Sequence, residues 1–401
     1  MSIRSRKEDF PVLQSKAVTY LDTAASSLTP RVVMDAMNRY YEEFPVNVHR
    51  GVYELGYEAT QAYETARDRV ARFLHAKRNE IVFTKGTSHA LNIVAHGLAK
   101  TLKPGDEILL SELEHHSNYL PWVEAAKLSG AQLTYVPLTA QGEITEEAFL
   151  NTLTSKTKIV ALTYVSNTMG TVTPLLKLIP HAHAVGALTV IDAAQAVPHM
   201  AIDVVALGVD FLAFSGHKMC GPTGIGVLYG KESLLNALAP FEFGGEMNDY
   251  VSKERVSYKD APYRFETGTP PIAEALGLHA AIDYLESITF ERISAHEKAL
   301  RDYTMERLKK IPGVIIYNPH APTGIIHFNL QDIHPHDAVT AFDQDHVAVR
   351  AGHHCAQLVM HWLNVPATLR ASFYLYNDYA DCDRFLSSVQ SALDFFSGVG
   401  F

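Results

Sequence analysis

The chain of 401 residues is 47% hydrophobic and 19% charged, with a formal net charge of −10 at pH 7, which predicts a globular protein with a large core. The acidic balance without a long basic run argues against nucleic-acid binding. Neither a secretory signal nor an apolar run near the ~20 residues of a membrane span is evident, so no membrane partner is expected.

The spacing of the three cysteines indicates the cellular compartment in which the protein is expected. Cys220, Cys355 and Cys382 lie far apart and form no C-x-x-C pair. A disulfide framework is therefore not expected, and a reducing cytoplasm is the natural location.

The first two thirds of the chain alternate between helical patterns and short apolar runs. Residues 58–76 carry apolar side chains at three- and four-residue spacings, which predicts an amphipathic helix. The elements expected after it are a strand at 81–83, a turn at 86–88, a helix at 90–99 and strands at 107–110, 159–165, 188–191, 211–214 and 226–229. This alternation predicts an α/β fold with a mainly parallel sheet, in which ligands bind beyond the carboxyl ends of the strands. Because polar residues follow most of these strands, we expect them to converge on one site.

The last third of the chain has a different pattern of predicted helices and strands. The elements expected there are a long helix at 291–311, strands at 314–317 and 324–330, and an amphipathic helix at 383–396. We predict a large domain over residues 20–288 and a smaller α+β domain made of residues 1–19 and 289–401.

Two charged residues at strand ends are candidates for chemistry. Lys218 follows the run 211–214, where desolvation lowers the pKa of a lysine and makes its amine a better Schiff-base nucleophile. The alternative is a solvated lysine in a turn. Asp192 follows the run 188–191, where a buried carboxylate needs a positive partner such as a protonated pyridine nitrogen. The alternative for Asp192 is a helix cap. Taken alone, neither Lys218 nor Asp192 decides between its chemical role and its structural alternative.

A phosphate site is suggested by the hydroxyls around one turn. Gly86-Thr87-Ser88 lies between a strand and a helix, where hydroxyls and free amides bind phosphate or simply cap the helix. Ser215 and His217 would add donors to the same phosphate.

Histidines follow another strand end. His115 or His116 can lie on a pyridine ring and move protons near neutral pH, or the two can form a surface or metal-binding pair. No close histidine pair has a cysteine or carboxylate at the spacing of zinc ligands, so no metal site is predicted.

In the segment Arg350-Ala351-Gly352-His353-His354-Cys355 a cysteine follows a glycine and several basic or polar residues. Gly352 permits a flexible loop, and Arg350 with the two histidines makes an electropositive setting that favours thiolate. The alternative is a buried structural cysteine, which is the role expected of Cys220 and Cys382. Arg370 can grip an α-carboxylate with two parallel hydrogen bonds, or form a surface ion pair.

Together these segments resemble fold type I pyridoxal-phosphate enzymes of the class V aminotransferase family, and among them the SufS-type (group II) cysteine desulfurases and selenocysteine lyases. The resemblance covers essentially the whole chain. It is carried by Tyr20 to Ser26, His49-Arg50-Gly51, Glu114 to Asn118, Asp192 to Gln195, Phe214 to Lys218, Gly221 to Gly226, Gly268-Thr269-Pro270 and Arg350 to Gln357.

The resemblance implies pyridoxal 5′-phosphate as the cofactor and L-cysteine as the substrate. The implied contacts to the cofactor ring are Lys218 as the covalent anchor and proton carrier, His115 stacked on the ring, Asp192 at the pyridinium nitrogen and Gln195 at the ring hydroxyl. The implied phosphate ligands are Thr87, Ser88, Ser215, His217 and, from a neighbouring subunit, Thr269. The implied substrate ligands are Asn167, Arg370 and Arg350. Cys355 matches the nucleophile that becomes a persulfide while L-alanine is released.

A phosphate ligand lent by a neighbouring subunit implies a homodimer with shared active sites. The version Arg350-Ala351-Gly352 is found among desulfurases that pass sulfur to a zinc-containing SufU-type acceptor, with a SufE-type acceptor as the alternative, and iron–sulfur cluster assembly is the expected use. The phosphate turn departs from the family pattern at Ser88-His89, where the family often has Thr followed by a small or acidic residue. This departure affects the role of Ser88 more than that of Thr87.

Other functions remain as alternatives at this point. An aminotransferase or β-eliminating lyase would use the same cofactor, but transamination needs no thiol at Cys355. Selenocysteine lyase activity is a closer alternative, because selenium leaves more readily than sulfur. A cofactor-free scaffold would have lost Lys218 or Asp192, and both are present.

Overall fold

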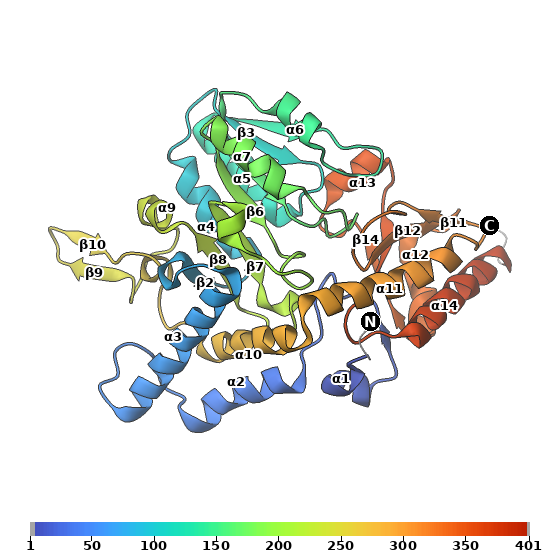
Figure 1. Cartoon of the computed structure of the whole chain (residues 1–401), viewed down its shortest axis with the longest axis horizontal. Helices are drawn as coiled ribbons and strands as arrows, with labels where there is room; N and C mark the ends of the chain where they lie inside the picture. The colour runs from blue at the N-terminus through green and yellow to red at the C-terminus, as the bar shows by residue number, and fades with distance from the viewer. Residues whose placement is uncertain (1–4, 399–401) are drawn as a thin grey trace.

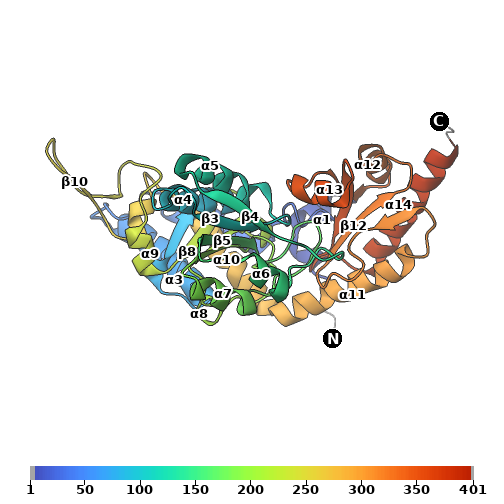
Figure 2. The same cartoon turned by 90° about the horizontal axis from the view of Figure 1, so that it is seen from above.

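The chain folds around two separate sheets that a long helical segment connects (Figures 1 and 2). The structure, a computed structural model, describes residues 5–398. The larger sheet has the strand order β2-β8-β7-β6-β5-β3-β4. Its strands are β2 (Ile81–Thr84), β3 (Glu107–Ser111), β4 (Gln132–Val136), β5 (Thr157–Thr163), β6 (Leu188–Asp192), β7 (Phe211–Ser215) and β8 (Gly226–Gly230). Within this sheet only β8 runs against its neighbours, so the predicted α/β fold with a mainly parallel mixed sheet is confirmed.

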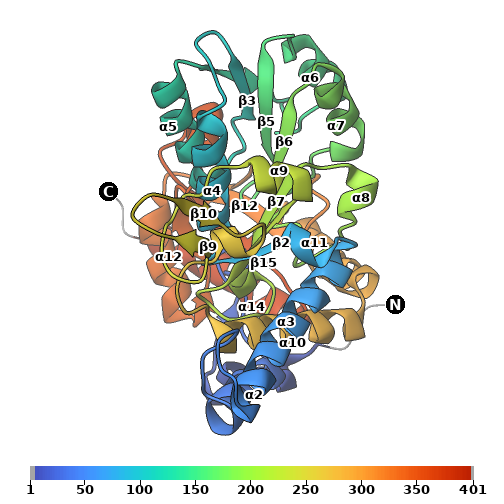
Figure 3. The same cartoon turned by 90° about the vertical axis from the view of Figure 1, so that its left-hand side faces the viewer.

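Helices cover both faces of this sheet (Figure 3). One face carries α4 (Thr87–Ala99) and α5 (Leu120–Ser129), and the other carries α6 (Glu146–Thr152), α7 (Leu175–Ala184) and α8 (Val204–Leu207). Side chains alternate between the two faces along each strand, so Val190 packs in the cluster with α4 and α5 while Ile191 packs in the opposite cluster. Burial on both faces explains why these strands read as continuous apolar runs in the sequence.

The smaller sheet lies in the C-terminal part of the chain. Its strands, in the order β11-β12-β15-β14, are β11 (Val314–Ile316), β12 (Ile325–Leu330), β15 (Thr368–Ser372) and β14 (Arg350–Gly352), and all neighbours are antiparallel. Side chains of α11 (Phe290–Leu308), α12 (Pro335–Gln344) and α14 (Tyr379–Gly398) share one core with this sheet.

The N-terminal segment packs against this C-terminal part. β1 (Thr19–Tyr20) pairs in parallel with β13 (Val347–Ala348), and the N–H of Arg6 donates to the carbonyl of Leu375 at 3.1 Å. At the other junction, α10 (Ile272–Ile288) meets α11 at Thr289, whose φ is +75°. The division into residues 20–288 and residues 1–19 with 289–401 stays a prediction, and residues 1–4 and 399–401 of it lie outside the described part of the chain.

The other α-helices and one hairpin complete the fold. They are α1 (Pro11–Ser15), α2 (Arg31–Glu43), α3 (Glu54–Leu74), α9 (Glu232–Ala237), α13 (Gln357–Leu363) and the hairpin of β9 (Asn248–Val251) and β10 (Val256–Tyr258), which projects from one end of the molecule (Figure 1). No helix among residues 5–398 is long and apolar enough to cross a membrane.

The structure corrects several predicted boundaries. β4 was not predicted, because this edge strand is largely exposed and has no apolar run. β5 begins and ends two residues before the predicted range 159–165, and α14 begins at Tyr379 rather than 383. α3 covers Glu54–Leu74 instead of 58–76, since His75 adopts a left-handed conformation (φ +60°) that ends the helix.

Candidate active site

The polar residues that follow strands β2, β3, β5, β6 and β7 meet in one pocket of about 160 Å³. Residues beside β14 and β15 of the smaller sheet close it from the other side. All but two of the predicted site residues line this pocket: Thr87, Ser88, His115, Asn167, Asp192, Ser215, His217, Lys218, Arg350, Cys355 and Arg370. The convergence expected from the carboxyl ends of parallel strands is therefore present.

The turn before α4 forms one end of the pocket. Gly86 has a φ of +148°, a conformation that favours glycine. A Cβ on Gly226 of the neighbouring strand β8 would lie 2.5 Å from the Cα of Gly86, so the two backbones approach this closely only because residue 226 is glycine. The side chain of Ser215 accepts from the N–H of Thr87 at 2.8 Å and lies 2.7 Å from its hydroxyl. Gly86, the N-cap residue of α4, has no side chain to cap the helix, and the helix dipole at this end favours an anion.

Asp192 and Lys218 form the floor of the pocket. Asp192 ends β6 with 4% of its surface exposed and accepts from the N–H of Ala194 at 2.9 Å. Burial raises the pKa of Asp192, and the charge of Lys218 opposes this. Burial lowers the pKa of Lys218 to about 8, and the charge of Asp192 opposes this. The buried carboxylate of Asp192 is thus suited to a cationic partner. Near pH 8 about half of the Lys218 amine is in its neutral form.

His115 and His217 are both neutral at physiological pH. Burial, followed by the charge of Lys218, lowers the pKa of His115 to about 3 and that of His217 to about 4. The Nδ1 atom of His115 accepts from the N–H of Ser117 at 3.1 Å, which fixes the ring in the turn after β3. Ser88 completes this corner, because its hydroxyl lies 2.6 Å from that of Ser117.

Two arginines and Cys355 form the opposite rim. Cys355 is exposed and lines the same pocket as Lys218 and Arg370. Arg370 is 1% exposed; its Nη1 donates to the carbonyl of Asn167 at 2.9 Å and its Nη2 to Asp22 at 3.1 Å. Arg350 donates to the other oxygen of Asp22 at 3.1 Å. The buried Nε of Arg370 has no hydrogen-bond partner among residues 5–398, which is rare for a buried donor.

Two predicted ligands use their amide groups on the backbone. Asn167 donates from Nδ2 to the carbonyl of His354 at 2.8 Å, and Gln195 donates to the carbonyl of Ala24 at 2.5 Å. Gln195 is buried beside the pocket rather than in its lining, and it holds the segment that carries Ala24 and Ala25. The expected contacts of Asn167 with substrate and of Gln195 with the cofactor stay predictions.

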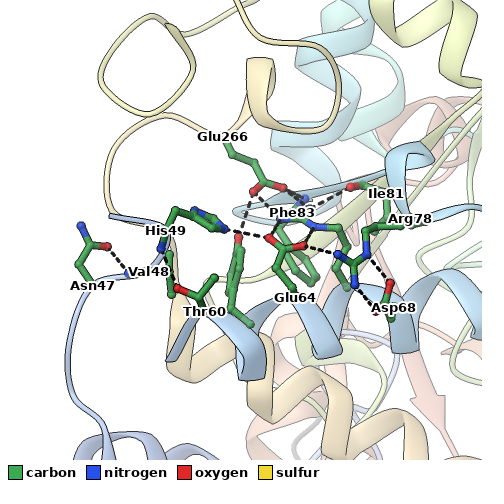
Figure 4. Close-up of polar contacts among 12 residues, drawn as sticks. Asn47, Val48, His49, Thr60, Glu64, Asp68, Arg78, Ile81, Phe83 and Glu266 are labelled. Carbon is green, nitrogen blue, oxygen red and sulfur yellow. Dashed lines mark hydrogen bonds and ion pairs between the residues drawn. The ribbon is translucent and has the colours of Figure 1, made fainter. Parts of the chain in front are cut away.

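Thr269 lies outside the pocket, in an exposed segment before α10. Glu266, three residues earlier, anchors this segment in a buried ion cluster (Figure 4). Arg67 donates to both oxygens of Glu266, at 2.6 and 2.8 Å, and to Glu64 at 3.1 Å. The N–H of Phe83 also donates to Glu266, at 2.8 Å. The cluster fixes where Thr269 is displayed on the surface, whereas its expected role in a neighbouring subunit stays a prediction.

Comparison with known proteins agrees with this geometry. The model of the family "Aminotransferase class-V" matches residues 19–385. The chain belongs to this family. Proteins named "Probable cysteine desulfurase" from Halalkalibacterium halodurans (100% of both chains) and Staphylococcus aureus (97% of this chain and 96% of the other) are each 48% identical to it.

Solved structures of the same family share the whole fold. The cysteine desulfurase CsdA from Escherichia coli, in an S-sulfonic acid form, has a TM-score of 0.91 at 38% identity over 97% of this chain and 98% of that chain. The apo cysteine desulfurase from Thermococcus onnurineus has a TM-score of 0.94 at 40% identity over 98% of this chain and 100% of that chain. The predicted family and the fold type I architecture are confirmed.

The pocket fits pyridoxal 5′-phosphate, the predicted cofactor of this member of the "Aminotransferase class-V" family. The N-terminus of α4, whose N-cap residue is Gly86, and the hydroxyls of Thr87 and Ser215 suit the phosphate. Across the pocket, a buried carboxylate at Asp192 suits a protonated ring nitrogen. A lysine with a lowered pKa, Lys218, lies beside it and suits the aldehyde.

Sequence reasoning missed Asp22, which joins Arg350 to Arg370. It was wrong about the charge of His354, which was expected to make the surroundings of Cys355 electropositive. His354 lines the pocket with 5% of its surface exposed, and burial lowers its pKa, so its ring is neutral. Asp22 stands in the Tyr20 to Ser26 segment that carried part of the family resemblance, and that was the available signal. His354 is adjacent to Cys355, but nothing in the local pattern separates it from the exposed His353.

Proposed function

We propose that the chain is a cysteine desulfurase that takes sulfur from L-cysteine and stores it as a persulfide on Cys355. The observation that carries the proposal is an exposed thiol at the rim of the pocket that holds Lys218 and Asp192. Transamination needs the lysine and the carboxylate but no thiol, so Cys355 favours sulfur transfer. The names of the relatives with 48% identity support the same reaction.

Binding and orientation come from the residues of the floor and the phosphate turn. Pyridoxal phosphate, when bound, supplies an electron sink for the carbon that bears the substrate amine. Asp192 would hold the ring nitrogen in its protonated form, and the neutral ring of His115 would lie against the cofactor ring. Arg370, which lines the pocket, binds the carboxylate of L-cysteine, and its contacts with Asn167 and Asp22 hold the guanidinium in place.

Lys218 is the proton carrier. With a pKa of about 8, a substantial fraction of its Nζ is neutral near physiological pH and can accept the α-proton of the bound substrate. The same ammonium then returns a proton as the product forms. Burial is the main cause of this low pKa; the charge of Asp192 raises the pKa and the charge of Arg370 lowers it.

Cys355 supplies the nucleophile. Its thiolate attacks the sulfur of the substrate; the new S–S bond forms, the C–S bond breaks, and the electron pair of that bond stays with carbon, which takes up a proton. One thiol of the enzyme and one molecule of cysteine thus give one persulfide and one molecule of L-alanine. Arg350 and Arg370 favour the anionic sulfur during the attack.

The later fate of the sulfur belongs to the same proposal. We propose a homodimer in which Thr269 completes the phosphate site of the partner, and a SufU-type or SufE-type acceptor that clears the persulfide for iron–sulfur cluster assembly in the cytoplasm. The support is an open cleft of about 550 Å³ outside Cys355, lined by Asp22, His116, Arg350, His353 and Gln357 among others, which gives an acceptor thiol access. L-cysteine is proposed as the main substrate, with selenocysteine as the competitor to be measured.

The test is mass spectrometry of the purified holoenzyme after brief exposure to L-cysteine without reductant, with alanine assayed in parallel. We expect one added sulfur on Cys355, alanine in matching amount, and no added sulfur on the buried Cys220 and Cys382. The Cys355→Ala variant should bind the cofactor but form no persulfide. Full cysteine desulfuration with an acceptor by Cys355→Ala, or no alanine from a cofactor-loaded wild type, would contradict the proposal.

A further inference from the structure

Cys355 lies in a turn that its own residues do not favour. His354 and Cys355 are consecutive non-glycine residues in the left-handed region, each with a φ of +53°. This conformation costs roughly 1–2 kcal/mol for each such residue, so the turn needs support from outside. Only Gly352, with a φ of +120°, adds local freedom two residues before the turn.

Support on one side comes from the side chain of His354. Its Nε2 lies 2.9 Å from the hydroxyl of Thr368 in β15, and the Nε2 of His327 lies 2.6 Å from the same hydroxyl. Both histidines are buried, and burial lowers both of their pKa values, so the rings are neutral. The first residue of the left-handed pair is therefore fixed to the smaller sheet.

Support on the other side comes from loops of the larger sheet. The N–H of His116 donates to the carbonyl of Cys355 at 2.7 Å, and Asn167 donates to the carbonyl of His354 at 2.8 Å. The Nε2 of His116 also accepts from the N–H of Gln357 at 3.2 Å. Gln357 is the first residue of α13, and the N-cap residue Ala356 makes no side-chain bond to this helix. The imidazole of His116 therefore accepts from a backbone N–H at the start of α13 that no capping side chain satisfies.

We propose that His116 is a positioning residue for the nucleophile: with its backbone and its ring it docks the Cys355 turn onto the larger sheet and so aims the thiol at the substrate sulfur. The role rests on the proposed function, in which Cys355 is the nucleophile. His116 follows His115 directly, so the residue that covers the cofactor and the residue that holds the nucleophile share one turn after β3.

The experiment separates positioning from folding by reading two steps in the same holoenzyme. Binding of L-cysteine changes the absorbance of the bound cofactor and needs no contribution from Cys355, whereas persulfide formation on Cys355 requires the docked turn. The variants are His116→Leu, which removes the acceptor, and His116→Gln, whose Oε1 reaches about as far as the Nε2 of histidine. His361→Leu, an exposed histidine on α13, is the matched control.

We expect His116→Leu to keep the cysteine-dependent absorbance change within about twofold and to slow persulfide formation about tenfold, the effect of one lost hydrogen bond. His116→Gln should recover most of the rate, and His361→Leu should match wild type. Equal rates of persulfide formation in His116→Leu and wild type, or no recovery in His116→Gln, would overturn the inference. If His116→Leu does not fold, His116→Ala takes its place beside His116→Gln. Absence of persulfide in wild type would instead refute the proposed function itself.

Discussion

Glu114 offers a test of the electrostatics beneath the candidate site. This carboxyl is 0% exposed and accepts hydrogen bonds of 2.6 Å from both Ser111 and Asn118. Burial raises its pKa from 4.5 to about 8, the two hydrogen bonds oppose the increase, and the charge of Asp192 adds to it. Glu114 therefore carries a proton at neutral pH, next to the turn that holds His115.

The sign of the pH effect follows from the two pKa values. Between pH 4.5 and 8 the folded state holds a proton on Glu114 that the unfolded state has released, so the free energy of unfolding falls as pH rises through this range. The difference of about 3.5 pH units corresponds to at most ~5 kcal/mol at ~1.36 kcal/mol for each unit. Between pH 6 and pH 9 the loss amounts to about 2–3 kcal/mol, because part of it has already occurred below pH 6.

The perturbation is Glu114→Gln, a neutral side chain of the same shape. We expect the free energy of unfolding of wild type to fall by about 2–3 kcal/mol relative to this variant from pH 6 to pH 9, measured by urea unfolding of the holoenzyme. Glu112→Gln, two residues away and partly exposed, is the control and should follow wild type. If all three proteins show parallel pH profiles, Glu114 is ionised in the folded state and the reasoning is wrong.

Three further outcomes are expected. The rate at which apoenzyme captures pyridoxal phosphate, followed by absorbance, should rise with pH and level off near pH 8, because only the neutral amine of Lys218 attacks the aldehyde; a rate still rising at pH 10 would exclude the lowered pKa. Gly226→Ala should weaken cofactor binding in equilibrium dialysis about tenfold or more, since its Cβ meets Gly86, while Gly245→Ala, whose Cβ meets open space, should not. Arg370→Lys should raise KM for L-cysteine about 10- to 100-fold with a smaller change in kcat, and an unchanged KM would remove Arg370 from substrate binding.

The sequence predicted the larger sheet and its pocket well, for a physical reason. Strands buried on both faces appear as unbroken apolar runs, and in a parallel sheet the residues after such runs must lie at one edge. Asp192 and Lys218 were located in this way, without knowledge of the strand order. The edge strand β4 was missed because it is largely exposed, and an exposed edge leaves no apolar run to detect.

The partners of individual side chains could not be predicted by the same reasoning. Asn167 was correctly expected at the pocket, but its amide can donate to a carboxylate or to a carbonyl, and the carbonyl it meets belongs to His354, far away in the chain. The left-handed pair His354 and Cys355 is equally invisible in the sequence, because it is imposed by contacts from both sheets rather than by local preference. The exposed thiol of Cys355 is positioned by contacts from both sheets, because neither sheet holds its turn alone. His116 makes such contacts with the backbone around Cys355, so it affects the geometry of the site although other side chains carry out the chemistry.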